Sequence, residues 1–328
     1  MDSLLDFVGN TPLVELTRIN PNPKVKLLGK LEGHNPGGSV KDRAAYSMIK
    51  GAVERGEIKA GMPNHGEPAN ILWKAKHIDA HLFQMQVTSS KEGLHIERKI
   101  LLDENDAVFH VTESVTNINT LGRLFNLVQH PTIATPFLNE HTIVNCNADK
   151  GFEYRNGDKA EQHLVQWSTV ADDSNNEFDL RYSNHVFNSV YSFVVNPNEK
   201  YGWITSYSPA HQLIFGYVWL RKSFPWINLW QHFEEGKIKY RGLEFGTTGL
   251  HQSFQTIWKN NMFKVLGENT TVYIDAGEKI SYQYACFLCE VKEEITGIKN
   301  VEIKDDRIIL TTQNMQTLEA GSINYHES

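Results

Sequence analysis

Glu244 is a residue whose type and surroundings together call for a chemical explanation. It lies inside RGLEF, an otherwise largely apolar run at residues 241–245. Burying a carboxylate is costly unless the group is paired, hydrogen-bonded or put to use. Arg241 stands three residues earlier and is a candidate ion partner. Glu244 is therefore predicted to be either half of a structural ion pair or an acid or base in a site.

Two histidines lie in turn-like surroundings. His65 belongs to NHGEP and is followed by Gly66 and Pro68, while His130 belongs to VQHPT and precedes Pro131. Glycine and proline at these spacings are typical of turns. Histidine also changes its charge near neutral pH, so each residue is either part of a turn or a proton donor and acceptor.

The cysteines do not indicate a redox or metal site. Cys286 and Cys289 form a C-x-x-C, but they lie in YQYACFLCEV, an alternating, aromatic-rich run that predicts a strand. An odd spacing on a strand puts two side chains on opposite faces. With three cysteines in the whole chain, neither a disulfide framework nor a metal centre is expected.

Composition indicates a globular protein. The 328 residues are 40% hydrophobic and 22% charged, with a net charge of -7. This charge provides no basic field for nucleic acid or an anionic membrane. The sequence contains no apolar run of about 18 residues, and MDSLLDFVGNTPL does not have the pattern of a signal peptide. We therefore expect a cytoplasmic location, with neither nucleic acid nor membrane as a partner.

The pattern of the chain changes near residue 62. Phe7 and Tyr46 are the only aromatic residues before residue 63, and no tryptophan lies there. Residues 39–56 place apolar side chains on one helical face, with Gly56 at the expected C-cap. This part reads as a short α/β fragment. We predict two units, at residues 1–62 and 63–328.

Beyond about His77 the sequence consists of short alternating runs separated by turn residues. Such runs, without a long helix between them, predict an antiparallel β-sandwich or barrel. The predicted strands are 81–89, 94–103, 107–117, 142–146, 190–197, 201–207, 271–277, 280–291, 298–306 and 307–314.

The first unit carries GNTPL at 9–13, KLEGHNP at 30–36 and NPGGSVKDRAA at 35–45. Over about residues 4–62 these strings resemble the start of cysteine synthases, the O-acetylserine sulfhydrylases that use pyridoxal phosphate. The resemblance implies that Lys41 corresponds to the lysine that forms the aldimine with the cofactor. The T-S-G-N-T-G and G-T-G-G-T loops that follow in such enzymes are missing from this sequence.

The second unit carries MPNHGEPANILW at 62–73, NLVQHPTIATPFL at 126–138 and RGLEFGTTGLHQSF at 241–254. Their order resembles that of galactose mutarotase-like proteins, the aldose 1-epimerase superfamily, over about residues 62–328. The resemblance implies a mainly β fold, an antiparallel supersandwich. It also implies acid/base opening of a sugar ring, with Glu244 as the base, His130 as the acid on the ring oxygen, and His65 as a second imidazole near the reacting centre.

Tryptophans are candidate sugar-binding residues, because sugar rings stack their C–H faces on aromatic rings. Trp226 and Trp230 lie four apart in FPWINLW and would share a face of a strand, either in a sugar cleft or in the core. Trp73 has the same two interpretations. Arg241 is included as a further substrate-binding candidate or as the structural partner of Glu244.

Three functions follow from these residues. The leading expectation is an aldose 1-epimerase-like isomerase, or a carbohydrate-binding relative, that interconverts sugar anomers without a metal or organic cofactor. The alternatives are a pyridoxal phosphate enzyme of the cysteine synthase type that uses Lys41, and a non-catalytic sugar-binding protein. The expected partner is a small-molecule sugar, and a homodimer is compatible with the sequence. Family members usually have further strands before the H-G motif, and here the cysteine synthase-like segment occupies that position.

Overall fold

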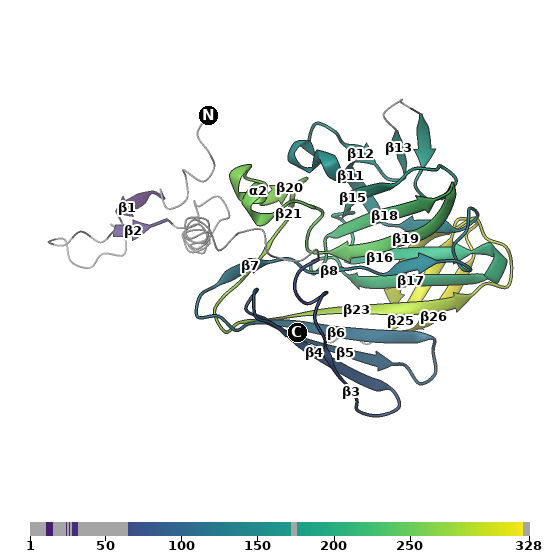
Figure 1. Cartoon of the computed structure of the whole chain (residues 1–328), viewed down its shortest axis with the longest axis horizontal. Helices are drawn as coiled ribbons and strands as arrows, with labels where there is room; N and C mark the ends of the chain where they lie inside the picture. Colours follow the sequence, from purple (N-terminus) through teal and green to yellow (C-terminus); the bar gives the residue numbers. More distant parts are fainter. Residues whose placement is uncertain are drawn as a thin grey trace.

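Two large antiparallel sheets form most of the structure (Figure 1). The computed structural model describes residues 11–15, 24, 26, 28–31, 65–171 and 176–323. The predicted helix at 39–56 and Lys41 lie outside these ranges. Residues 62 and 63 also lie outside these ranges, so the predicted division between them stays a prediction. All ten predicted strand segments contain a strand.

The first sheet has eight strands, and β3 lies at one edge with all four residues exposed. Residues with alternating apolar and polar character produce these strands, because successive side chains point to opposite faces. In spatial order the strands are β10 (Ile143–Cys146), β16 (Tyr201–Ser208), β17 (Leu213–Leu220), β23 (Lys279–Glu290), β6 (Val108–Asn117), β5 (Leu94–Leu102), β4 (Leu82–Ser89) and β3 (Lys74–His77).

The second sheet has nine strands and carries the residues of greatest chemical interest. Strand β19 pairs with β18 on one side and with both β8 and β9 on the other. In spatial order the strands are β14 (Glu177–Asp179), β13 (Thr169–Ala171), β12 (Val165–Gln166), β11 (Ala148–Glu153), β15 (Ser189–Val195), β18 (Trp226–Glu234), β19 (Lys237–Gly246) and β8 (Val128–Gln129), with β9 (Thr132–Ala134) beside β19.

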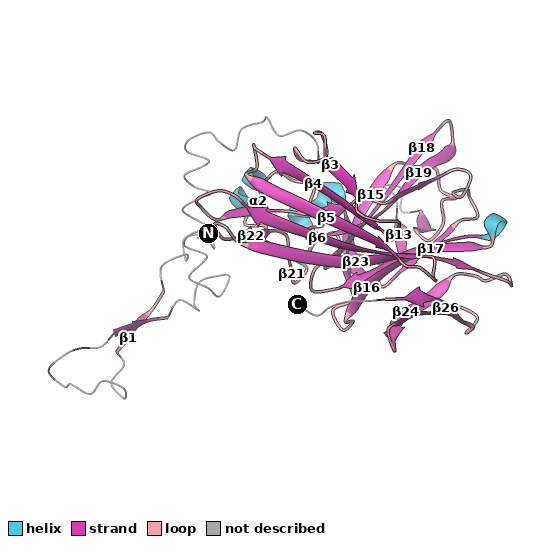
Figure 2. Cartoon of the chain, turned by 90° about the horizontal axis from the view of Figure 1, so that it is seen from below, coloured by secondary structure: helices cyan, strands magenta, loops and turns pink. Residues whose placement is uncertain are grey.

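Short elements complete the described part of the chain, and Figure 2 shows how few helices there are among the strands. They are the pairs β1 (Leu13–Glu15) with β2 (Leu28–Lys30), β7 (Arg123–Phe125) with β22 (Val272–Ile274), and β20 (Lys264–Val265) with β21 (Glu268–Asn269); the three-stranded sheet of β24 (Ile298–Lys304), β25 (Arg307–Thr312) and β26 (Thr317–Ser322); helix α2 (Phe254–Lys259); and the 3-10 turns η4 (Tyr154–Lys159) and η5 (Pro209–His211).

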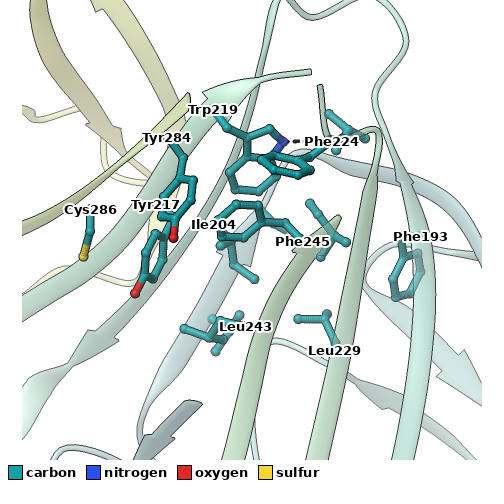
Figure 3. Close-up of a cluster of buried hydrophobic side chains, with 14 of the residues drawn as sticks. Phe193, Ile204, Tyr217, Trp219, Phe224, Leu229, Leu243, Phe245, Tyr284 and Cys286 are labelled. Carbon is teal, nitrogen blue, oxygen red and sulfur yellow. Dashed lines mark hydrogen bonds between the residues drawn. The ribbon is translucent and has the colours of Figure 1, made fainter. Parts of the chain in front are cut away.

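The main core lies between the two large sheets (Figure 3). Phe245 of β19 is fully buried there and stacks on Trp219 of β17, with ring centroids 4.1 Å apart. Leu243 of β19 faces the same core. Glu244 lies between these two residues on the strand, so its side chain points to the opposite face. This face of the nine-stranded sheet is called the outer face below.

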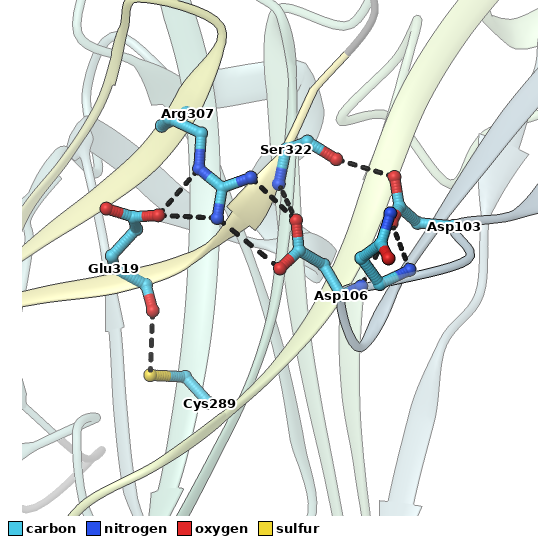
Figure 4. Close-up of polar contacts among 7 residues, drawn as sticks. Asp103, Asp106, Cys289, Arg307, Glu319 and Ser322 are labelled. Atoms are coloured by element: carbon cyan, nitrogen blue, oxygen red, sulfur yellow. Dashed lines mark hydrogen bonds and ion pairs between the residues drawn. The ribbon is translucent and has the colours of Figure 1, made fainter.

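A second core covers the other face of the eight-stranded sheet, where the three-stranded sheet packs. Cys286 belongs to the main core and Cys289 to this second core, so the two cysteines do lie on opposite faces of β23, as predicted. Arg307 of β25 binds both Asp106 and Glu319, and the Ser322 hydroxyl donates to Asp103 at 2.6 Å (Figure 4). These polar contacts attach the small sheet to the turn between β5 and β6.

Candidate functional site

A row of polar residues crosses the outer face of the nine-stranded sheet. Ser192 of β15 pairs with Asn228 of β18, and Asn228 pairs with Glu244 of β19. On the far side of β19, Phe245 pairs with Gln129, so His130 follows next to Glu244. Strand register therefore brings together residues that lie up to 114 positions apart in the sequence.

Glu244 and His130 form the centre of the site. His130 Nδ1 lies 2.9 Å from Glu244 Oε1, and the two side chains are 41% and 9% exposed. A pair that is open to solvent on one side contributes little to stability. The pair therefore matters for its chemistry rather than for stability. It places a carboxylate and an imidazole within hydrogen-bonding distance, and the imidazole is accessible to solvent.

His65 completes the group that the sequence predicted. Its ring meets the ring of His130 edge-on, with centroids 4.8 Å apart. The residue adopts a φ of 63°, and Gly66 follows with a φ of 80°, so the predicted turn is present. Residues of the turn are fixed by Glu67, whose carboxylate accepts hydrogen bonds from the Ser89 hydroxyl and the Lys91 N–H, both at 2.8 Å.

The residue before His130 is anchored in a buried polar network. Gln129 donates to Glu113 at 3.0 Å and accepts from the Tyr284 hydroxyl at 3.1 Å. Arg98 binds Glu113 at 2.7 Å. Burial alone would lower the pKa of Arg98, but the charge of Glu113 keeps this pKa above its ordinary value. The network holds β8 in place from the side opposite to Glu244.

His251 is a site residue that sequence reasoning missed. Its Nε2 lies 3.4 Å from the Ser192 hydroxyl, and its ring meets Tyr154 edge-on at 5.7 Å. His251 is exposed, yet the protein atoms around its ring displace enough water to lower its pKa; Glu244 opposes this shift, whereas His130 and His65 add to it. These interactions place four titratable groups near one another. The sequence did contain a signal for His251, since this residue belongs to RGLEFGTTGLHQSF at 241–254, the string that also contains Glu244.

Asn228 is a second site residue that sequence reasoning missed. It is 2% exposed, and its Nδ2 donates to the Thr248 carbonyl at 3.2 Å. Its Oδ1 is buried without a partner among the described residues. Such an acceptor is uncommon in a native structure and marks a position where a donor would be stabilising. The sequence did contain a signal for Asn228. It lies two residues from both Trp226 and Trp230, so the three side chains share one face of a strand.

The tryptophan predictions have mixed outcomes. Trp226 and Trp230 share the outer face of β18, as predicted. Trp226, however, is fully buried in a hydrophobic cluster with Leu250, and its Nε1 donates to the Asn269 carbonyl, so its proposed contact with sugar is wrong. Trp230 is half-buried beside Gly242.

Arg241 does not join the Glu244 site, and Trp73 makes its contacts with the main core and Arg98. Arg241 is 1% exposed, donates to the Ser183 hydroxyl at 2.7 Å, and also binds the Leu180 carbonyl. It lies three residues from Glu244 and therefore faces the other side of β19, so it is neither an ion partner of Glu244 nor a sugar ligand. Trp73 packs against the main core with Arg98 over its ring at 5.5 Å.

Two further observations concern the described ranges. They contain no group of three or more histidine, cysteine, aspartate or glutamate side chains arranged to hold a metal ion. Within the same ranges, no helix has the length and apolar character needed to cross a bilayer.

Comparisons with known proteins give two kinds of similarity. A family model described as "Pyridoxal-phosphate dependent enzyme" matches residues 4–118. Cysteine synthase B of Salmonella typhimurium is 57% identical over 61 residues, which are 19% of this chain and 20% of that protein. A probable cysteine synthase of Bacillus subtilis is 52% identical over 56 residues, which are 17% of this chain and 18% of that protein. The chain thus spans about a fifth of the length of these curated relatives.

Solved structures resemble the β-sandwich instead. A galactose mutarotase related enzyme of Lactobacillus acidophilus has a TM-score of 0.52 at 9% identity, covering 72% of this chain and 77% of that one. A protein of Escherichia coli K12, provisionally assigned as an aldose 1-epimerase, has a TM-score of 0.51 at 15% identity, covering 69% and 72%. The chain therefore has a galactose mutarotase-like, mainly β fold, together with a segment similar in sequence to cysteine synthases.

Proposed function

We propose that the Glu244 site opens and closes the ring of a free sugar, as an aldose 1-epimerase-like isomerase does. The observation that carries this proposal is the 2.9 Å contact between His130 Nδ1 and Glu244 Oε1, with His65 against the ring of His130. Anomer interconversion needs one base and one acid at the same acetal carbon. The proposed reaction needs no metal and no organic cofactor, and its partner is a small-molecule sugar.

The proposed reaction moves two protons. Glu244 takes the proton from the anomeric hydroxyl while His130, in its protonated form, donates a proton to the ring oxygen. The bond between the anomeric carbon and the ring oxygen breaks, and an open-chain aldehyde forms. After rotation about the adjacent carbon–carbon bond, the ring oxygen attacks the other face of the aldehyde. His130 recovers its proton and Glu244 returns the other, so the enzyme is unchanged.

The neighbours of this pair suit the holding of a hydroxylated ligand. A ligand hydroxyl would satisfy the unpaired Oδ1 of Asn228 after a small side-chain adjustment, and the exposed ring of His251 offers a further polar atom. Tyr154, which is 37% exposed, adds an aromatic ring beside His251. Polar groups for hydroxyls next to a ring for C–H faces are the usual composition of a sugar site.

Polarimetry on freshly dissolved α-glucose and α-galactose tests the proposal. The wild-type protein should accelerate mutarotation over buffer. Glu244→Gln keeps the shape of the side chain and removes the base, so the rate should fall by about 10²- to 10⁴-fold. Glu97→Gln is the matched control, because it makes the same chemical change at a carboxylate of β5 that pairs with Lys279. Equal rates for wild type and buffer would refute the catalytic proposal.

A sugar-binding protein without turnover would give a different result. Quenching of tryptophan fluorescence by sugars, with no acceleration of mutarotation, would assign the site to binding alone. Loss of that quenching in Glu244→Gln would locate the ligand at the same site.

The sequence similarity of the amino-terminal segment favours a second candidate, pyridoxal phosphate chemistry at Lys41. Lys41 lies outside the described residues, so this candidate rests on sequence alone. It requires a yellow protein whose visible absorbance disappears on borohydride treatment and in Lys41→Ala. A colourless protein that takes up no added pyridoxal phosphate would exclude it.

A further inference from the structure

Arg98 of β5 connects two segments that meet at the Glu244 site. Its guanidinium donates to Glu113 from Nε at 3.1 Å and from Nη2 at 2.7 Å, and Nη2 also donates to Gln129 at 3.2 Å. Its Cζ lies over the ring of Trp73, 5.5 Å from the ring centroid. One guanidinium therefore binds side chains from distant parts of the chain, some with its N–H groups and one with its flat face.

Trp73 carries this connection to the turn that holds His65. The Nε1 of Trp73 donates to the Pro68 carbonyl at 2.8 Å. Pro68 lies three residues after His65, in the turn that Glu67 also anchors. The side chain of His65 is exposed, so the turn and the neighbouring ring of His130 set its position.

Gln129 carries the connection to His130, which follows it in the sequence. Gln129 is buried, and its amide oxygen accepts from Arg98 and from the Tyr284 hydroxyl, while its amide nitrogen donates to Glu113. Both polar atoms of the side chain are thus bound, and a fully bonded buried network favours a single arrangement. The backbone that leads into His130 is therefore held from the core.

We infer that Arg98 is a positioning residue that sets the geometry of His65 and His130 together, from the core side of the site. Its role in catalysis rests on the proposed function, whereas its role in placing the two rings does not. A displacement of about 1 Å at a reacting group can lower a rate by about 100-fold. Arg98 acts through Trp73 and Gln129 rather than on the sugar.

A lysine cannot make the same set of contacts. Its ammonium is a single point charge for Glu113, whereas the planar guanidinium spreads its N–H groups over Glu113 and Gln129 and offers a face to Trp73. Arg98→Lys therefore keeps the charge and breaks the connection. Arg307→Lys is the matched control, because Arg307 of β25 also binds carboxylates, those between the small sheet and the turn between β5 and β6.

NMR signals of the histidine rings test the placement without a ligand and without activity. The His65 signal is followed in a His130→Gln background and the His130 signal in a His65→Asn background, so that neither ring reports on the other. Each signal is assigned by its loss in the corresponding single variant. Arg98→Lys should move both signals, and Arg307→Lys should move neither. An unmoved signal at either histidine in a folded Arg98→Lys protein would overturn the joint role.

Two further variants keep the test decisive if Arg98→Lys does not fold. Trp73→Phe keeps a ring for Arg98 and removes the N–H that holds the turn, so it should move the His65 signal and leave the His130 signal in place. Gln129→Met removes the polar atoms before His130 and should do the opposite. Any other pattern contradicts the two connections.

Kinetics by polarimetry tests the consequence for catalysis. Per folded molecule, Arg98→Lys should lower kcat for mutarotation by about 10- to 100-fold with little change in KM, because the groups that hold the sugar are kept. Arg307→Lys should keep the wild-type kcat. A wild-type kcat in Arg98→Lys would overturn its part in catalysis. If the wild type itself does not accelerate mutarotation, the proposed function fails, and the histidine signals still decide whether Arg98 places the two rings.

Discussion

Phe245 supports the site from the core side, and its truncation should be felt in both stability and activity. The side chain is fully buried and stacks on Trp219 at 4.1 Å with an interplanar angle of 7°. It also meets Tyr284 and Phe224 edge-on, at 5.3 Å and 5.5 Å (Figure 3). On its backbone Phe245 pairs with Gln129, the residue before His130.

The expected cost of Phe245→Ala is about 4–5 kcal/mol in the free energy of unfolding. Truncating a buried phenylalanine to alanine costs about 3–5 kcal/mol, a range that already includes the loss of its ring contacts. The upper part of the range applies because hydrogen-bonded strands on both sides of β19 limit collapse around the cavity. Phe245→Leu keeps an apolar side chain that fills part of the cavity and should cost less, about 1–2 kcal/mol.

Equilibrium unfolding in urea, followed by tryptophan fluorescence and by far-UV circular dichroism, measures these costs. Leu288→Ala on β23 is the control: its side chain is 42% exposed, so its cost should stay below about 1 kcal/mol. A cost below about 1 kcal/mol for Phe245→Ala would refute the packing argument. Phe245→Leu should also slow the proposed mutarotation, since the packing of Phe245 in the core supports the strand that carries Glu244.

Two predictions concern pH. The protein atoms around the exposed His251 lower its pKa, so the folded protein binds this proton less readily than the unfolded chain. Solvent screens an exposed group, so stability should fall only slightly as the pH drops below about 6.5. His251→Gln should accordingly flatten the small change in urea midpoint between pH 7.5 and 5.5. Hydrogen bonds, first from Ser322, lower the pKa of Asp103 to about 2, so its contribution to stability is present above the unfolded value of 3.8 and is lost as the pH falls toward 2. Asp103→Asn should therefore lower Tm at pH 6, and its Tm should fall less between pH 4 and 2 than that of the wild type. An unchanged Tm at pH 6 would contradict this.

The strands were predictable because each carries its own pattern. In β23, for example, residues alternate between two cores, so Cys286 and Cys289 could be assigned to opposite faces from spacing alone. Trp226 and Trp230 could be assigned to one face by the same rule. Strand order was a different matter, since β19 lies between β18, its neighbour in sequence, and β8 and β9, which are more than a hundred residues earlier.

The site was predictable in part. The sequence singled out His65, His130 and Glu244, and the structure brings these three together. Arg241 was misplaced because its distance from Glu244 in sequence suggested a contact that strand alternation forbids. For Trp226 the sequence left both the sugar cleft and the core open, because a single pattern cannot distinguish a residue left open for a ligand from one covered by α2 and its neighbours, and the structure places it among the buried residues.

By itself the sequence determined which side chains share a face of a strand and which residue types could exchange protons, because period and chemistry are local properties of the chain. Only the tertiary structure decided that Ser192, Asn228, Glu244 and His130 lie in one row. Register across strands sets such a row, and register depends on how two sheets bury their apolar faces against each other.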